Sequence, residues 1–336
     1  MTIARPTIRD VARLAGVSHQ TVSRVINEFE KVNPDTRKKV EAAISTLGYY
    51  PSAIARSMAR GVTRTLACIS PNLTDFTFAS IIEGAEVEAR SQGYFLLSSS
   101  SSDSDTFSQL INELVGHRRV DGLIVINPYA DNRHQFIPAN FPVVLVGANS
   151  RDSSVSSVSL DDERVAYEAV QHLIFLGHRK IAMITGPMEE DCSQDRAKGY
   201  ARALENAGIK VNPDWILEGD WSATSGLNGM KSLIEQGQIP SAVFAQNDRM
   251  AMGVIRTAHD NNLNVPKDLS VIGVDDMPLS SYYHPPLSTM RQDMPGIGRD
   301  ATRILIDLVN KTGKSVCQIK VSGELIARQS TTNAII

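Results

Sequence analysis

Three polar side chains that could read a nucleic acid lie within six residues of one another: His19, Gln20 and Arg24. A guanidinium can pair with both major-groove acceptors of guanine, and a glutamine amide can pair with adenine. Each such pair is worth about 1–3 kcal/mol of discrimination between bases. If one exposed helical face carries all three, they predict base contacts with double-stranded DNA.

The flanking sequence predicts the helices that would position these side chains. Apolar residues at helical spacing indicate a helix over 8–15, and Gly16 ends it. Ser18 is a good N-cap for a second helix over 19–27, in which Val22 and Ile26 face inward. Asn33 precedes a third helix that runs to residue 47. Two short helices joined by a short turn containing glycine are typical of the helix-turn-helix unit.

The distribution of charge supports a nucleic-acid partner. Residues 1–61 contain ten Lys and Arg and five Asp and Glu, a net charge of +5, whereas the whole chain carries −3. The rest of the chain is therefore at −8. A basic segment on an acidic body indicates that the segment contacts the phosphates of a nucleic acid and that the body does not.

The segment between these helices and the body has two interpretations. Ser52 can cap a short helix over 53–59, which is too short to be stable alone in water. It is either an ordinary linker or a hinge helix that orders only when it is paired with its copy and with DNA.

From Leu66 onward, continuous apolar strands alternate with amphipathic helices, which indicates parallel sheets covered on both faces. The expected strands cover 66–70, 95–99, 121–127, 142–147, 156–160, 180–186, 241–248 and 270–276, and the expected helices cover 79–92, 105–118, 162–176, 194–207 and 249–262. About 275 residues exceed one comfortable core, so we expect two similar α/β lobes. The fold class is thus α/β, with a helix-turn-helix domain joined to a two-lobed core of parallel sheets.

Sheets of this kind bind ligands at the carboxyl ends of their strands. Asn247 and Asp275 follow two such strands, Arg196 opens a helix, and Trp221 lies in a loop. Carboxylate, amide and guanidinium groups match sugar hydroxyls, and an indole stacks on the apolar face of a pyranose. Asp248 and Asp276 are expected to be structural carboxylates instead. Asn72 and Phe76 could complete the wall contributed by the first lobe, although Phe76 alone could be core.

Several other classes of protein are disfavoured. No GxSxG, HExxH, Walker or GxGxxG pattern occurs, so we expect no enzyme and no catalytic residue. Cys68, Cys192 and Cys317 are widely spaced and show no metal-ligand spacing, so no metal or cofactor is expected. No apolar run is long enough for a membrane span and no signal peptide is evident, which predicts a cytoplasmic protein without a membrane partner.

The whole chain resembles the lactose-repressor/galactose-repressor (LacI/GalR) family of bacterial transcriptional regulators, and its motifs are closest to those of the lactose repressor. The motifs that carry the resemblance are IRDVARLAGVSHQTVSRVIN, GYYPSAIARSM, LGHRKIAMITGP, FAQNDRMAMGV and VIGVDDMPLSSYYHPPLSTMRQ. The resemblance implies a helix-turn-helix domain over 1–48, a hinge helix over 49–61, an N-terminal lobe over 62–161 plus 292–322, and a C-terminal lobe over 162–291 plus 323–336.

The resemblance also implies roles for single residues. It places His19, Gln20 and Arg24 on bases, the hinge in the minor groove, and Arg196, Trp221, Asn247 and Asp275 on the effector. Expected DNA-backbone contacts are Thr7, Ser18, Thr21, Ser23, Asn27, Asn33 and Thr36, and expected hinge contacts are Ser52, Ala55 and Met58. Thr7, Ser18 and Asn33 also have a purely structural interpretation as helix caps.

Three departures from the lactose repressor matter. His19 stands where that protein has Tyr, Gly147 where it has a sugar-contacting Asp, and Met294 where it has an aromatic residue. Gly147 and Met294 remain candidate effector residues, but these changes put β-galactosides in doubt. A saccharide is the favoured effector class, and a purine stays open.

The resulting prediction is a repressor of sugar-catabolic genes that binds a palindromic operator as a homodimer. The tail after Glu324 has no leucine heptad, so no further association is expected. The alternatives are a sugar- or purine-binding protein of transport type and a purine-responsive, corepressor-dependent regulator.

Overall fold

The computed structural model describes residues 6–26, 32–50, 61–129, 131, 133–147, 155–312 and 316–334. The contacts divide the chain into two compact units, Met1–Arg64 and Thr65–Ile336. Within the described ranges, no helix is long and apolar enough to cross a membrane.

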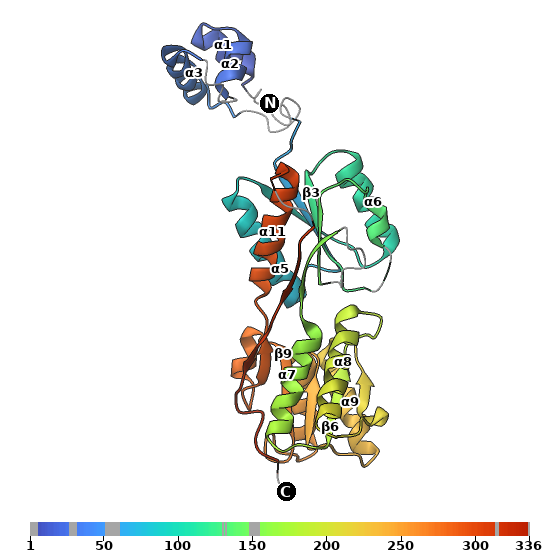
Figure 1. Cartoon of the computed structure of the whole chain (residues 1–336). Helices are drawn as coiled ribbons and strands as arrows, with labels where there is room; N and C mark the ends of the chain where they lie inside the picture. Colours follow the sequence, from blue (N-terminus) through green and yellow to red (C-terminus); the bar gives the residue numbers. More distant parts are fainter. Residues whose placement is uncertain are drawn as a thin grey trace. The chain divides into compact units, whose positions relative to one another are not determined.

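In the described residues of the first unit, three helices are present (Figure 1), and they surround a small apolar core. They are α1 (Ile8–Ala15), α2 (His19–Ile26) and α3 (Pro34–Leu47). Val22 and Val25 of α2 are buried in this core, while Ile26 is half-buried against it. Gly16 and Gly48 end α1 and α3 in the left-handed conformation, which glycine adopts without steric cost.

The second unit contains two six-stranded sheets, each covered by helices (Figure 1). The first sheet has the strand order β11-β5-β4-β3-β1-β2, and all its strands are parallel. We call this sheet and its helices the first lobe. Its strands are β1 (Thr65–Ser70), β2 (Phe95–Ser100), β3 (Gly122–Ile126), β4 (Val143–Val146), β5 (Ser156–Leu160) and β11 (Gln318–Val321), and its helices are α5 (Phe76–Ser91), α6 (Ser104–Ile111, followed by a π-helical turn Asn112–Gly116) and α11 (Met294–Asn310), with a 3-10 turn at Arg133–Phe136.

The second lobe has the strand order β12-β10-β9-β8-β6-β7, and only β12 runs antiparallel, beside β10. Its strands are β6 (Ile181–Thr185), β7 (Ile216–Glu218), β8 (Ala242–Ala245), β9 (Ser270–Asp275), β10 (Ser288–Arg291) and β12 (Glu324–Ile326), and its helices are α7 (Asp162–Phe175), α8 (Asp191–Asn206), α9 (Ala223–Glu235) and α10 (Asp248–Asp260), with 3-10 turns at Pro213–Trp215 and Pro278–Tyr282. The predicted α/β class with two parallel-sheet lobes is therefore confirmed.

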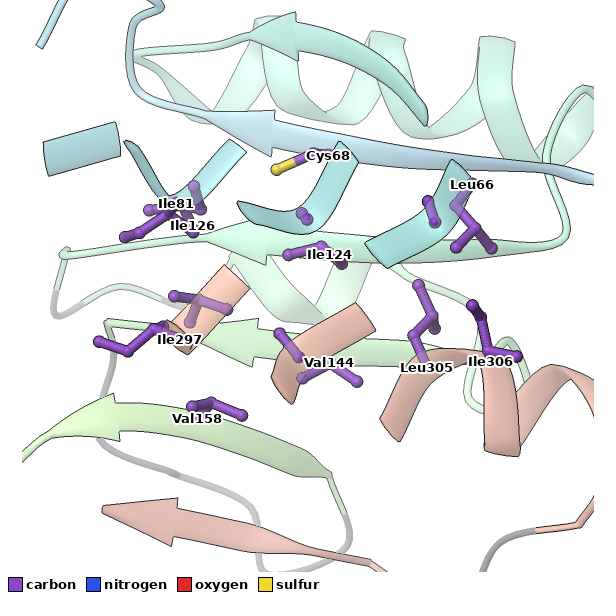
Figure 2. Close-up of a cluster of buried hydrophobic side chains, with 14 of the residues drawn as sticks. Leu66, Cys68, Ile81, Ile124, Ile126, Val144, Val158, Ile297, Leu305 and Ile306 are labelled. Atoms are coloured by element: carbon purple, nitrogen blue, oxygen red, sulfur yellow. The ribbon is translucent and has the colours of Figure 1, made fainter. Parts of the chain in front are cut away.

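Each lobe has an apolar core on both faces of its sheet. In the first lobe, α5 and α11 pack over one face, where Leu66, Ile124 and Leu305 meet (Figure 2), and α6 covers the other. Cys68 is part of this core, and burial raises the pKa of its thiol to about 12. In the second lobe, α7 and α8 cover one face, and α9 and α10 the other.

The chain passes between the lobes three times: from β5 to α7, from β10 to α11 and from β11 to β12. These crossovers lie close together, since the Asp161 backbone N–H donates to the Val321 carbonyl at 2.9 Å and Arg291 pairs with Glu324 across β10 and β12. Six elements were not predicted from the sequence: the helices α9 and α11 and the strands β7, β10, β11 and β12. These four strands have only three or four residues each, too few for a periodic signal.

Candidate functional site

The helix-turn-helix unit exposes the three predicted base-reading residues. His19, Gln20 and Arg24 are exposed on α2, while Val22 and Val25 on its other side are buried. This division follows from the helical period, since residues three and four apart share a face. The geometry fits a recognition helix, and the base contacts themselves stay a prediction.

The predicted helix caps are confirmed in the first unit. The Thr7 N–H donates to Asp10 Oδ2 at 2.9 Å, and the Thr21 N–H donates to Ser18 Oγ at 3.1 Å. Asn33 Oδ1 accepts from the Asp35 N–H at 2.8 Å. Among the other expected backbone contacts, Thr21, Ser23 and Thr36 are half-buried. Asn27 and the hinge residues Ser52, Ala55 and Met58 lie outside the described residues.

A cleft of about 460 Å³ lies between the two lobes, within the size range of small-molecule sites. It brings together five of the predicted effector residues: Asn72 of the first lobe, and Arg196, Trp221, Asn247 and Asp275 of the second. These residues come from strand ends and helix starts separated by more than 200 positions. Asn72 orders its own loop, since its Oδ1 accepts from the N–H groups of Thr74 and Asp75.

The Arg196 side chain is buried and already has partners. Its Nε donates to Asp162 Oδ1 at 2.7 Å, and its Nη1 donates to the Gln246 carbonyl. Asp162 begins α7, directly after the first crossover. Burial raises the pKa of the Asp162 carboxyl, although the Arg196 charge opposes this effect. Arg196 thus lines the cleft with its charge balanced by the Asp162 carboxylate.

Trp221 is held as a flat wall of the cleft. Its indole Nε1 donates to Glu190 Oε2 at 3.0 Å, and its carbonyl accepts from Asn247 Nδ2 at 3.0 Å. A Cβ on Gly186 would lie 2.1 Å from Trp221 Cζ2, so only glycine lets the ring approach the end of β6. The Arg196 guanidinium lies 5.7 Å from the centre of the indole ring.

The carboxylates after β8 and β9 have different roles. Asp275 lines the cleft and accepts from Gln292 Nε2 at 3.3 Å, and burial raises its pKa well above the ordinary value. Asp248 is fully buried and accepts from Ser280, Thr289 and the Met277 N–H. Asp276 pairs with Arg291 and Arg328. The expectation that Asp248 and Asp276 are structural is confirmed.

Three predicted effector residues, Phe76, Gly147 and Met294, are not among those that line the cleft. Met294 lies in the apolar core of the first lobe, because the first turn of α11 packs on the sheet there. Phe78, two residues after Phe76 on α5, lines the cleft instead. The predicted side chain is therefore half a helical turn from the one that lines the cleft. The exact start of a helix decides which side chain faces a ligand, and the sequence does not fix that start.

The sequence analysis missed Asp75, Tyr129, Glu190 and Arg249, which also line the cleft. Tyr129 follows β3, and the rule that ligands lie at strand carboxyl ends could have identified it. Glu190 is buried, and this burial raises its pKa. Within the described ranges, no group of three or more His, Cys, Asp or Glu could hold a metal ion.

Comparisons with known proteins agree with this arrangement. Residues 7–52 match the family described as "Bacterial regulatory proteins, lacI family", and residues 170–331 match "Periplasmic binding protein-like domain". Catabolite control protein A of Priestia megaterium is 38% identical over 329 residues, which cover 97% of this chain and 99% of the relative. The HTH-type transcriptional repressor PurR of Haemophilus influenzae is 36% identical over 338 residues, covering 98% and 99%.

Solved structures show the same fold. The lac repressor dimer bound to operator and the anti-inducer ONPF superposes with a TM-score of 0.91 at 30% identity, covering 98% of this chain and 100% of that one. A complex of the transcriptional regulator CelR with cellobiose gives a TM-score of 0.76 at 30% identity, covering 97% and 100%. Of these proteins, PurR and the lac repressor are named as repressors and CelR as a transcriptional regulator.

Proposed function

This chain belongs to the LacI family of bacterial regulatory proteins, and from that premise we propose that it binds a palindromic operator as a homodimer under the control of a small saccharide. It is a DNA-binding transcriptional repressor with an effector-binding core. The single observation that carries the proposal is the exposure of His19, Gln20 and Arg24 on one face of α2 in a chain related to repressors over its whole length. Its place of action is then the cytoplasm.

On DNA, α2 lies in the major groove. His19, Gln20 and Arg24 contact bases, while Thr7, Ser18, Thr21, Ser23, Asn27, Asn33 and Thr36 contact the backbone, and Ser52, Ala55 and Met58 contact the minor groove. Ser18 and Asn33 can each cap a helix and contact a phosphate at the same time, because a hydroxyl or an amide group can form more than one hydrogen bond.

The homodimer is supported by apolar side chains that the single chain leaves in solvent. Phe95 and Leu97 on the edge strand β2 are 78% and 39% exposed. In the second lobe, Leu279 and Tyr282 are 61% and 84% exposed. Exposed edge strands and apolar patches favour association.

A saccharide effector is supported by the chemistry of the cleft. Its lining offers amide, carboxylate and guanidinium groups beside one flat indole. Both lining arginines already face a carboxylate, Arg196 at Asp162 and Arg249 at Asp75. Because a carboxylate balances the charge of each arginine, the cleft favours a ligand with many hydroxyl groups over an anionic ligand.

Two observations keep a purine as the second candidate. A planar base could stack on Trp221 within reach of the Arg196 guanidinium, and relatives that are 36% identical are named PurR. A thermal-shift comparison of monosaccharides, disaccharides and purine bases separates the two classes. A shift with purines alone would overturn the saccharide proposal.

Operator binding is tested by selecting DNA from a random pool with the full-length protein. We expect an inverted repeat, and Arg24→Ala to lower the ratio of operator to random-DNA affinity by about tenfold or more. The control is Lys39→Ala, an exposed lysine of α3, which should leave that ratio unchanged. Recovery of no common sequence, or a ratio that Arg24→Ala leaves unaltered, would refute the base-reading role.

A further inference from the structure

One ion pair crosses the cleft from lobe to lobe. Asp75, at the start of α5 in the first lobe, accepts a hydrogen bond from Arg249 Nη2, in the first turn of α10 in the second lobe. The two residues are 174 positions apart in the sequence, and both line the cleft. A second contact crosses nearby, where the Asp191 N–H donates to the Pro128 carbonyl at 2.9 Å and Tyr129 forms an antiparallel bridge with Glu190.

The pair is fixed in position from both sides. Asp75 is the N-cap of α5, and its Oδ1 accepts from the Thr77 N–H at 2.9 Å, which leaves Oδ2 directed to Arg249. Arg249 follows Asn247, whose Oδ1 caps α10 at the Met250 N–H. The Asp75 side chain is 16% exposed and the Arg249 side chain 37% exposed, so the pair is partly shielded from water but added salt can still screen it.

The pair joins the two lobes, and neither of its residues belongs to the apolar core of a lobe. Each lobe has its own apolar cores, and only the three crossovers connect them covalently. A contact that joins two separately folded bodies across a cleft shifts the equilibrium between closed and open forms.

We propose that the Asp75–Arg249 pair is a clasp that holds the cleft closed when no effector is bound, so that Arg249 is a positioning residue of the effector site. The inference rests on the proposed function only in taking this cleft as the effector site. An effector that enters must separate the pair or bind around it, and its apparent affinity then includes the free energy of opening.

Fluorescence quenching tests the clasp without effector or DNA. The chain has two tryptophans, Trp215 and Trp221, so Trp215→Phe leaves the cleft residue as the only reporter. In that background, Asp75→Asn keeps an N-cap side chain but removes the charge, and Arg249→Gln removes the other partner. The measured quantity is the acrylamide quenching constant of Trp221 in the full-length protein.

We expect each variant to raise the ratio of open to closed forms about fivefold, and so to raise the quenching constant. The double variant should match the single ones, because one interaction is lost in all three. Added salt should raise quenching in the parent but not in the variants. The matched control is Arg256→Gln on the same helix, whose partner Asp260 lies in the same lobe; it should leave quenching unchanged.

Parent-like quenching in both single variants, or additive effects in the double variant, would overturn the clasp. If a variant folds poorly, the salt dependence of Trp221 quenching in the parent is an independent test. Quenching in the parent that does not change with salt would also overturn the clasp. Failure here leaves the proposed function standing, because that function is tested by operator selection and thermal shifts.

Discussion

Arg196 Nε lies 2.7 Å from Asp162 Oδ1, and both side chains are almost completely buried. The pair links a residue that faces the cleft to the first residue of α7 after a crossover. A buried ion pair is costly to break from one side only, because the remaining charge has no partner. One buried ion pair therefore connects the candidate effector site to the crossover between β5 and α7.

Asp162→Asn should destabilise the protein by about 3–5 kcal/mol, because it leaves the Arg196 charge buried and unpaired. The measurement is urea unfolding followed by circular dichroism. The control is the neighbouring change Glu163→Gln, which breaks a more exposed pair with Arg202 and should cost less than about 1 kcal/mol. Equal losses for the two variants would contradict the assigned role of burial.

Arg196→Ala should abolish the effector response, but the geometry adds a loss of stability that the sequence did not indicate. The double variant Arg196→Met, Asp162→Leu removes both charges and should regain most of that stability. It should still show no thermal shift with the sugar or purine that stabilises the parent. A parent-like shift in the double variant would remove Arg196 from the effector site.

Gly186→Ala should displace the Trp221 ring, since the new Cβ would lie 2.1 Å from its Cζ2 atom. With Trp215 replaced by Phe, we expect a red-shifted emission and stronger acrylamide quenching. In a Trp221→Ala background, the same glycine change should have little effect on the urea midpoint. A large loss there would mean that Gly186 is needed for a reason other than the indole.

Stability should fall as the pH drops below about 6.5, the pKa of an unfolded histidine. Burial lowers the pKa of His178, whose ring lies 3.0 Å from Ser241 Oγ, Ser270 Oγ and the Thr332 carbonyl. His178 therefore takes up a proton at a lower pH in the folded protein than in the unfolded chain. Its contribution is full above pH 6.5 and is lost as the pH falls toward its lowered folded pKa.

Urea unfolding between pH 7.5 and 5.5 measures this slope, which is at most about 1.4 kcal/mol per pH unit for one histidine. His178→Gln should reduce the slope without removing it, since burial also lowers the pKa of His172. His259→Gln, at an exposed histidine of the same lobe, should leave the slope unchanged. An unchanged slope in His178→Gln would assign the acid sensitivity to other groups.

Some of the site could be predicted from the sequence because it depends on neighbours in the chain. Ser18 and Asn33 cap helices within two or three residues, and Val22 is buried by the helical period. Asn247 and Asp275 follow apolar strands, so a parallel sheet brings them to one edge. A polar residue at the end of a strand indicates a binding site. It does not show which groups of the protein its side chain already contacts.

The sequence by itself determined the three N-terminal helices, the longer strands and most of the helices of the body, the division of charge and the exposed face of α2, because caps and periodicity act over a few residues. Only the tertiary structure decided that Asp162 neutralises Arg196, that Arg249 reaches Asp75 in the other lobe, and that Met294 is core. The two ion pairs join residues 34 and 174 positions apart, and the packing of two sheets around three crossovers fixes them. No local propensity encodes which distant partner a charge will meet.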